Sequence, residues 1–296
     1  MPDVRIRPLR EDDVPAVERV QETGFAALDA RTLPRGRPLP PRRTPEENEP
    51  WAERARHLLR TDPEGCWVAE HGDGTVVGYA LALRRETLWV LASFVVRPDA
   101  QGRGVGTQLL AAAAQHGRGC LRAMLSASAD PAAVRRYRLA GFDLHPQMEL
   151  HGHVDRALLP VVRHVRPGTE ADRDLLDSLD RRTRHAAHGV DHALLARQLR
   201  LLVVDRPSAQ GYAYVDASGS PRLLAATDRR TARALVWEAL AASAPDVAVS
   251  VPHVTAANQW ALDVGVEARL SVATAGYLAV RGLRPPAPYV HHGSLL

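Results

Sequence analysis

The stretch RPDAQGRGVGT, residues 97–107, decides how this chain folds. An apolar run at 88–96 precedes it and is typical of a buried strand, and the run at 108–114 that follows predicts a helix. Three glycines alternate within the stretch, so the backbone can approach a ligand closely and direct several N–H groups into one concavity. The start of the following helix adds the positive end of its dipole. This combination suits a bound pyrophosphate.

Two other phosphate-binding loops are excluded by composition and spacing. A P-loop ends in Gly-Lys-Ser or Gly-Lys-Thr, and the chain contains no lysine. A dinucleotide-binding loop has the spacing G-x-G-x-x-G and an acidic residue about 20 residues later. The present loop has the spacing G-x-G-x-G, and residues 123–128 hold no acid. The pyrophosphate must therefore belong to another class of ligand.

A second motif, PAAVRRYRLAGF at residues 131–142, predicts a helix with defined ends. Asp130 is a suitable N-cap, and Pro131 occupies the first helical position, where a backbone N–H has no partner in any case. Gly141 is expected to end the helix as its C′ residue. The helix carries Tyr137 one turn before this end.

In this order the two motifs resemble those of the GCN5-related N-acetyltransferases, the GNAT family. The family's loop Q/R-x-x-G-x-G/A is matched by residues 101–106, and its motif Y-x-x-x-G-F is matched by Tyr137, Gly141 and Phe142. The resemblance implies that the loop binds the pyrophosphate of acetyl-CoA, that the end of the preceding strand binds the pantetheine arm, and that Tyr137 protonates the departing thiolate. The cofactor-binding residues that the resemblance implies are Phe94, Val95, Val96, Gln101, Gly102, Arg103, Gly104, Val105, Gly106, Thr107 and Tyr137.

The sequence offers several candidates for the base that accepts the proton of the acceptor amine. Many family members carry a glutamate on the strand before the glycine loop, but residues 88–96 contain no carboxylate. We consider a water relay through Ser93, or Glu149 on a later strand, as the catalytic base, with Glu86 and His151 as further candidates. An amine that arrives neutral needs no dedicated base.

The same pattern of elements occurs twice along the chain. RPLREDD at 7–13 and RPGTEAD at 166–172 share R-P-x-x-E-x-D, and each follows a short strand-like segment and leads into a helix. We therefore predict an α/β (α+β) chain of two tandem GNAT-like domains, residues 1–158 and 159–296. Each domain is expected to have a mixed, mostly antiparallel central sheet flanked by helices.

The second copy lacks the residues that carry the chemistry of the first. After its central strand the loop reads TDRR at 227–230, with no glycine and with a carboxylate that would face a pyrophosphate. Aligning Gly265 with Gly141 places Ala261 where the first copy has Tyr137. The first domain is thus expected to bind acetyl-CoA, and the second to be structural or to shape the acceptor site.

Composition narrows the class of protein further. The 296 residues carry a net charge of +4 and the arginines are spread along the chain, which does not favour a nucleic-acid-binding protein. No apolar run reaches the length of a membrane span, and the N-terminus lacks a signal peptide pattern, so we expect a cytoplasmic protein without a membrane partner. Cys66 and Cys120 are expected to be reduced. The proline- and arginine-rich segment 32–45 predicts an exposed loop.

One histidine-rich segment contains residue types that can bind zinc. His185, His188 and His192 have helix-like spacing and lie beside Asp191. Gly189 interrupts the predicted helix, however, and no cysteine is near. We therefore predict no metal site and interpret the segment as a polar helix end that lines a cleft.

The two motifs and the composition together predict an acetyl-CoA-dependent N-acetyltransferase. Its acceptor is expected to be the primary amine of a small molecule, which attacks directly in a ternary complex, and the protein is expected to be a monomer or homodimer. The alternatives are an acetyl-CoA-binding regulatory protein without turnover, a mycothiol-synthase-like acetyltransferase with its catalytic unit in the C-terminal half, and a protein N-acetyltransferase.

Overall fold

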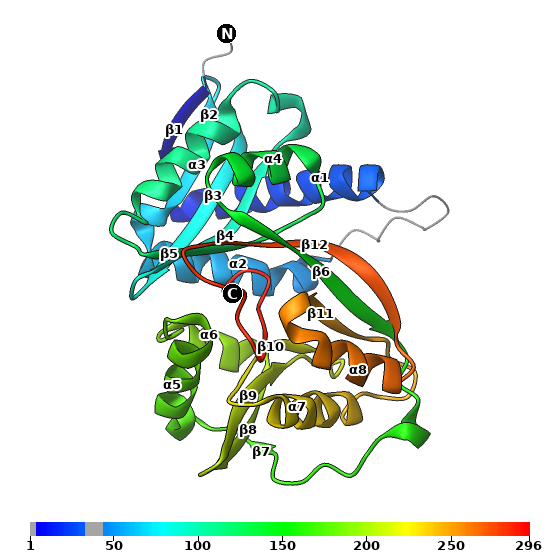
Figure 1. The fold of residues 1–296 in the computed structure, drawn as a ribbon. Coiled ribbons are helices and arrows are strands. Elements are labelled where there is room, and N and C mark those ends of the chain that lie inside the picture. Colours follow the sequence, from blue (N-terminus) through cyan, green and yellow to red (C-terminus); the bar gives the residue numbers. More distant parts are fainter. Residues whose placement is uncertain (1–3, 33–43) are drawn as a thin grey trace.

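The computed structural model describes residues 4–32 and 44–296, which form two β-sheets with helices packed on them (Figure 1). The predicted loop at 32–45 lies almost entirely outside these ranges. The first unit of the chain contains β1 (Val4–Pro8), α1 (Val14–Thr32), α2 (Pro45–Thr61), β2 (Cys66–His71), β3 (Val76–Arg85), β4 (Leu88–Val96), α3 (Val105–Gln115), β5 (Arg122–Ala127), α4 (Pro131–Leu139) and β6 (Asp143–Gly152). The second unit contains β7 (Arg166–Pro167), α5 (Arg173–Arg184), α6 (Asp191–Gln198), β8 (Arg200–Arg206), β9 (Ala209–Val215), β10 (Pro221–Ala226), α7 (Arg229–Ala241), β11 (Val249–Thr255), α8 (Gln259–Glu267), β12 (Ser271–Arg281) and β13 (Tyr289–Val290).

The strand order confirms the predicted fold class. An eight-stranded sheet has the order β1-β2-β3-β4-β5-β12-β6-β11, and a five-stranded sheet has the order β13-β10-β9-β8-β7. Among the described residues, β4 and β5 form the one parallel pair, and the other ladders are antiparallel. The eight-stranded sheet is therefore mixed and mostly antiparallel, the described ladders of the five-stranded sheet are all antiparallel, and helices pack on both sheets.

The last strands of the two units, β6 and β12, are exchanged between them (Figure 1). β12 lies between β5 and β6, with Ala279 opposite Leu125 on one side and opposite Leu144 on the other. β6 in turn lies between β12 and β11. The predicted boundary at 158/159 falls in the connection between β6 and β7, but β12 returns across it to complete the sheet of the first unit.

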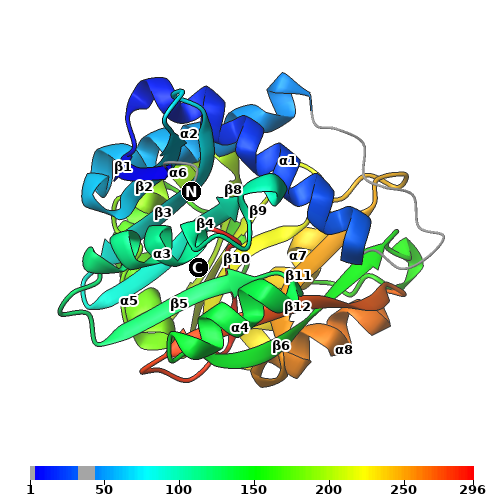
Figure 2. The ribbon, with the colours of Figure 1, turned by 90° about the horizontal axis from the view of Figure 1, so that it is seen from above.

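Helices cover both faces of the first half of the large sheet (Figure 2). α1 and α2 contribute Val17 and Leu58 to one core, together with Tyr79 of β3. α3 and α4 contribute Leu109 and Tyr137 to a second core on the opposite face. β3 and β4 are therefore buried on both sides, which explains their nearly continuous apolar sequences.

The repeated R-P-x-x-E-x-D motif folds in the same way in both units. In the first unit, Arg7 donates to both carboxylate oxygens of Asp13, at 2.7 and 2.9 Å. In the second unit, Arg166 donates to both oxygens of Asp172. Each aspartate also accepts the backbone N–H of the residue three positions earlier, at 2.8 Å in both units. The arginine thus fixes a carboxylate that holds the start of a helix, and the two copies share this local structure.

Candidate functional site

β4 and β5 are hydrogen-bonded along only part of their length. Their ladder joins Leu88–Leu91 to Arg122–Leu125 and ends there. The register of β4 against β3 shifts at the same place, so Ala92 is an extra residue in a β-bulge, which bends a strand. Residues 93–96 remain paired with β3, but within the described chain they have no ladder partner on the side of β5. We call residues 93–96 the open edge of β4, because its peptide groups can bind an extended ligand.

The glycine loop connects the open edge to the start of α3. Gly104 is the N-cap of α3 and has φ of +81°, a left-handed conformation that glycine adopts without strain. No side chain caps this helix, so N–H groups of its first turn are available to a ligand. Gln101 Nε2 donates to the carbonyl oxygen of Val96 at 2.9 Å and ties the loop to β4. The loop therefore presents the N–H groups and the dipole that an anion requires.

Arg136 on α4 lies against the same helix start, and the sequence analysis missed it. Its Nη1 is 2.7 Å from the position that a Cβ atom on Gly106 would take, and its guanidinium carbon is 5.8 Å from the centre of the Phe94 ring. The guanidinium of Arg136 has no hydrogen-bonded or ionic partner among the described residues. The glycine at position 106 thus makes room for a cation beside the glycine loop. The neighbouring Arg135 is exposed.

Tyr137 is buried on the side of α4 that faces the sheet. Its side chain is 5% exposed, and its ring meets Phe142 edge-on at 6.5 Å. Burial raises the pKa of the Tyr137 phenol above its ordinary value of 10. The phenol is therefore protonated at neutral pH, which is the form that can donate a proton.

The two candidate bases, Ser93 and Glu149, do not lie together. Ser93 Oγ is 2.8 Å from the phenol oxygen of Tyr79, which donates to Gln21 Oε1 at 3.3 Å. Burial raises the pKa of the Tyr79 phenol, so the phenol keeps its own proton at neutral pH. It therefore cannot accept a further proton through Ser93. Glu149 lies on β6, and β5 and β12 separate β6 from β4 by about 14 Å at the usual strand spacing. Ser93 is thus hydrogen-bonded to a phenol, and Glu149 lies far from Ser93 and from the open edge of β4.

In the second unit, the end of the chain occupies the edge that corresponds to the open edge. β10 follows the same order of elements as β4, and β13 pairs with it in antiparallel fashion. Leu224 lies opposite Val290, and Ala225 lies opposite Tyr289. Both β13 residues are buried. The strand edge that could bind an extended ligand is therefore filled by the protein itself.

The helix start in the second unit is filled as well. α7, the counterpart of α3, has Asp228 as its N-cap. Asp228 accepts the backbone N–H of Thr231 at 2.9 Å and its hydroxyl at 2.7 Å. This carboxylate occupies the anion-binding end of the helix, which Gly104 leaves open in the first unit.

The sequence alignment at the end of the second copy is wrong by four residues. Gly265 lies within α8, and Arg269 takes the left-handed conformation, φ +64°, that Gly141 takes after α4. In each copy the next residue donates its N–H to a carbonyl oxygen five positions back, which is that of Gly265 or Tyr137. Gly265, and not Ala261, is therefore the counterpart of Tyr137, and the second unit has no phenol at this place.

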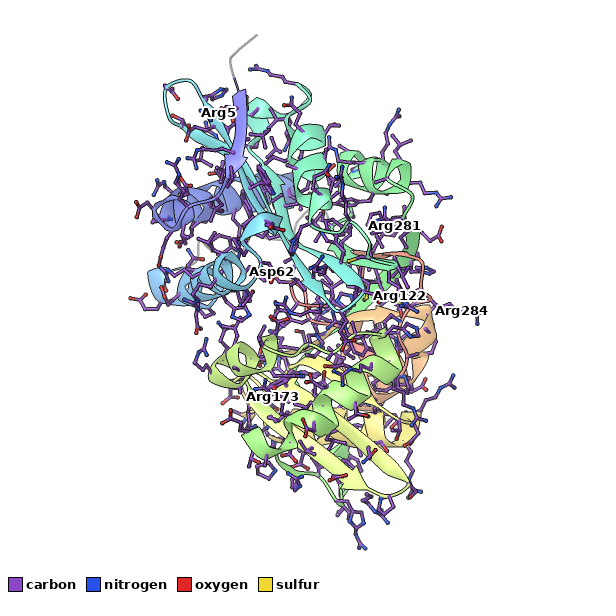
Figure 3. All side chains as sticks on the ribbon, turned by 90° about the vertical axis from the view of Figure 1, so that its left-hand side faces the viewer. Arg5, Asp62, Arg122, Arg173, Arg281 and Arg284 are labelled. Carbon is purple, nitrogen blue, oxygen red and sulfur yellow. The ribbon has the colours of Figure 1, made fainter. Side chains whose placement is uncertain are left out.

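A buried chain of charged side chains joins the two units near Asp62, which Figure 3 labels on the side of the first unit that faces the second. Arg85 donates to Asp62 at 2.8 Å and to Asp191 of α6 at 2.6 Å, and His57 lies 2.7 Å from Asp191. Burial alone raises the pKa of Asp62, but a hydrogen bond with His116 and the charge of Arg85 outweigh it and hold this pKa at about 2. These pairs attach α6 to the first unit.

The structure divides the predicted histidine cluster. His185 is exposed, Asp191 faces the first unit, and His188 and His192 are buried beside Asp180. The interpretation of this segment as a polar helix end lining a cleft is therefore wrong, because the two inner histidines are enclosed by protein. The expected interruption between the helices is present, since α5 ends before His185 and α6 begins at Asp191.

Comparison with known proteins shows which family the first unit resembles. Residues 30–142 match the sequence profile of the acetyltransferase (GNAT) family. Over this segment, the chain is similar to the GCN5-related N-acetyltransferases. No curated protein matches the chain. None of the described helices is long and apolar enough to cross a membrane.

Solved structures resemble the chain over both units. A protein from Pyrococcus horikoshii assigned as an acetyltransferase has a TM-score of 0.75 over 99% of this chain and 95% of its own, at 18% identity. GCN5-related N-acetyltransferases from Kribbella flavida and Sphaerobacter thermophilus both have a TM-score of 0.59 over 94% of this chain. The match covers 70% of the Kribbella flavida protein at 16% identity and 95% of the Sphaerobacter thermophilus protein at 15% identity. At these identities the likeness establishes the fold, including the second unit.

Proposed function

We propose that the first unit, residues 1–158, transfers an acetyl group from acetyl-CoA to the primary amine of a small molecule, and that residues 159–296 are a structural partner. The difference between the two units carries this proposal. The first has an open strand edge and an uncapped helix start at Gly104, whereas β13 and Asp228 fill the same places in the second. The family match at 30–142 falls on the open unit.

In this proposal the glycine loop and the open edge hold the two halves of the cofactor. The pyrophosphate binds the N–H groups at the start of α3, with the guanidinium of Arg136 beside it. The pantetheine arm lies along residues 94–96 and uses their unpaired peptide groups as an added strand would. Gln101 acts indirectly, because its side chain holds the carbonyl oxygen of Val96.

The proposed reaction is a direct attack on the thioester. The amine nitrogen bonds to the carbonyl carbon, the C–S bond breaks, and the electron pair leaves with the sulfur. Tyr137 donates its proton to that sulfur and regains one from the amine through solvent. A backbone N–H of the open edge polarises the carbonyl oxygen. Because neither Ser93 nor Glu149 offers a base at the open edge, we propose that the amine binds in its neutral form.

A second candidate function is an acetyl-CoA-binding regulatory protein without turnover. It is favoured because residues 88–96 contain no carboxylate and because Ser93 is hydrogen-bonded to the phenol of Tyr79 rather than to a base. Release of CoA thiol in the presence of a panel of amines distinguishes the two functions, since a regulatory protein binds acetyl-CoA without releasing thiol. The mycothiol-synthase-like alternative requires a catalytic unit in the C-terminal half. β13 argues against it, because β13 pairs with the edge of β10 that a cofactor would need.

Isothermal titration with acetyl-CoA tests the cofactor site. We expect one molecule to bind per chain, and Gly104→Val to abolish binding, because a β-branched residue at φ +81° must displace the loop. Gly119→Val is the matched control, since Gly119 has φ +82° in the turn that follows the opposite end of α3, and a side chain there meets open space. Wild-type protein that binds no acetyl-CoA would overturn the proposal.

A further inference from the structure

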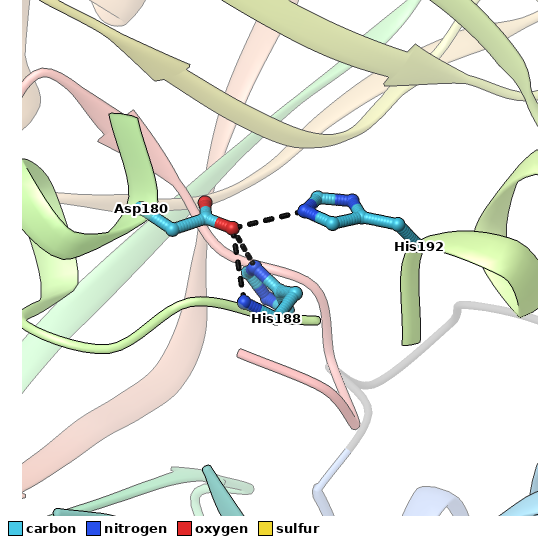
Figure 4. Close-up of side chains that lie close together, drawn as sticks. All are labelled: Asp180, His188 and His192. Carbon is cyan, nitrogen blue, oxygen red and sulfur yellow. Dashed lines mark hydrogen bonds and ion pairs between the residues drawn. The ribbon is translucent and has the colours of Figure 1, made fainter. Parts of the chain in front are cut away.

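A second cluster of polar side chains lies in the second unit, where α5 ends and α6 begins (Figure 4). Asp180 Oδ2 lies 2.7 Å from His188 Nδ1 and 3.1 Å from His192 Nε2. His192 Nε2 is also 3.3 Å from Asp177 Oδ1. We propose that Asp177, Asp180, His188 and His192 form a binding site for a divalent transition metal ion of the zinc type.

The chemistry of the four side chains fits such an ion. Two imidazoles and two carboxylates form a nitrogen and oxygen ligand set of the kind that zinc accepts in tetrahedral sites. Asp177 and Asp180 stand one turn apart on α5, and His188 and His192 come from the following loop and α6. One ligand atom from each of Asp180, His188 and His192 lies within 4.8 Å of the other two. These three ligands therefore converge from separate segments, and Asp177 adjoins them through His192.

The observed distances are close to those of a loaded site. Zinc bonds of about 2.1 Å in a tetrahedron place neighbouring ligand atoms about 3.4 Å apart. The three distances given above lie between 2.7 and 3.3 Å, so these three pairs of atoms need to move apart by less than about 1 Å. Such movement exchanges the contacts among these side chains for bonds to the ion, and each neutral imidazole carries its proton on the other ring nitrogen afterwards.

The surroundings of the cluster also favour a cation. Asp180, His188 and His192 are fully buried. Arg184 on the same helix forms no ion pair with either aspartate among the described residues, and its Nη2 lies 3.5 Å from the carbonyl oxygen of Leu295. The two carboxylates thus face imidazoles rather than a guanidinium in or at the edge of a protein interior, where a charge needs a partner, and the fully buried Arg184 acts on the cluster without contacting them. A divalent ion bound by both carboxylates would give each of them a charged partner.

Outer contacts hold the ligands in place, as they do in metal sites. Tyr212 donates its hydroxyl proton to the second oxygen of Asp180, and the backbone N–H of Gly189 donates to Asp177 at 3.0 Å. His192 Nδ1 lies 3.2 Å from the hydroxyl of Tyr214, an acceptor for the proton of a ring bound through Nε2. The site is enclosed, so we assign the ion a structural role. It would fix the start of α6, from which Asp191 reaches Arg85 of the first unit.

Metal content and stability test this proposal independently of acetyl-CoA. The full chain, freed of any histidine tag and stripped with a chelator, is dialysed against Zn²⁺ and its zinc is measured by mass spectrometry. We expect one zinc ion per chain, a higher Tm with zinc, and the visible absorption of a tetrahedral complex when Co²⁺ replaces it. His192→Gln should weaken zinc binding at least about tenfold in competition with a chromophoric chelator.

Matched variants separate this site from adventitious binding. His185→Gln changes an exposed histidine of the same segment and should retain wild-type affinity. Cys120→Ser should also retain it, which excludes binding through the partly buried thiol. Asp177→Asn is a second ligand variant at the partly exposed edge of the cluster, in case His192→Gln does not fold. Folded protein that holds no stoichiometric zinc, or variants that bind as tightly as wild type, would show that the cluster is only hydrogen-bonded.

Discussion

At the scale of single residues, Tyr137 carries the clearest prediction for the proposed reaction. Tyr137→Phe removes the phenolic oxygen and keeps the buried ring, so we expect kcat to fall at least about tenfold and the Kd for acetyl-CoA to stay within about twofold. Release of CoA thiol with an acceptor found in the amine panel gives kcat, and titration gives Kd. Unchanged turnover would remove Tyr137 from the mechanism.

Arg136 gives a second prediction at this scale. Arg136→Leu should weaken acetyl-CoA binding about tenfold and flatten its salt dependence, because a charged hydrogen bond to phosphate is worth about 1.5–3 kcal/mol. Arg135→Leu removes the same charge from the exposed side of α4 and serves as the control. Equal effects of the two substitutions would show that only the net charge of the helix matters.

Which of these residues the sequence could predict depends on how local their role is. The glycine loop and Tyr137 belong to short motifs, since their function rests on the spacing of neighbouring residues. Arg136 meets Gly106 only because α4 packs beside the start of α3, and the spacing within either helix does not reveal that contact. The partner of Ser93 could not be predicted for the same reason, because Tyr79 contacts Ser93 from the adjacent strand β3.

At the scale of secondary-structure elements, Asp62 connects α2, β3 and α3 and makes stability depend on pH. Its pKa of about 2 lies below the ordinary 3.8, so its contribution to stability is complete above pH 3.8 and is lost as the pH falls through about 2. The shift corresponds to about 2 kcal/mol. Asp62→Asn should lower Tm at pH 7 and flatten the fall of Tm between pH 4 and pH 2.

A matched substitution controls this measurement. Asp99→Asn changes an exposed carboxylate that pairs with Arg97 on the surface, so the dependence of Tm on pH should remain that of the wild type. Thermal unfolding followed by circular dichroism over this range gives both curves. Parallel curves for wild type and Asp62→Asn would mean that other carboxylates cause the acid transition.

Element ends show where local sequence signals were insufficient. The helix before Gly141 was predicted correctly because Pro131 and Gly141 mark its two ends. The end of α8 was misplaced because Arg269, rather than a glycine, takes the left-handed conformation there. β13 could not be predicted at all, since a strand of two residues exists only through its pairing with β10.

At the scale of the whole molecule, the exchanged strands predict that the units do not fold separately. A fragment of residues 1–158 lacks β12 and β11, so β5 loses one partner and β6 loses both of its partners. We expect this fragment to aggregate or to show no cooperative unfolding, and coexpression with residues 159–296 to restore a soluble complex. The intact chain should unfold in a single transition. A monomeric 1–158 fragment with a sharp transition would contradict this expectation.

The sequence predicted the two copies but not their exchange. The copies are visible in the repeated R-P-x-x-E-x-D motif, which is a local pattern. The exchange depends on contacts between residues far apart in the chain, such as Ala279 with Leu125 and Leu144. Both β6 and β12 have the composition of ordinary strands, so nothing in either distinguishes pairing within a unit from pairing across units.

The arrangement of β5, β12, β6 and β11 has the pattern of a two-fold axis. β6 and β12 lie antiparallel beside each other, and each borders the preceding strand of the opposite copy. A chain with one copy could make this exchange only as a homodimer, in which every substitution occurs twice. Joining the copies replaces that association with an intramolecular contact. It also frees the copies to diverge, so that one site can be closed by β13 and Asp228 while the other stays open.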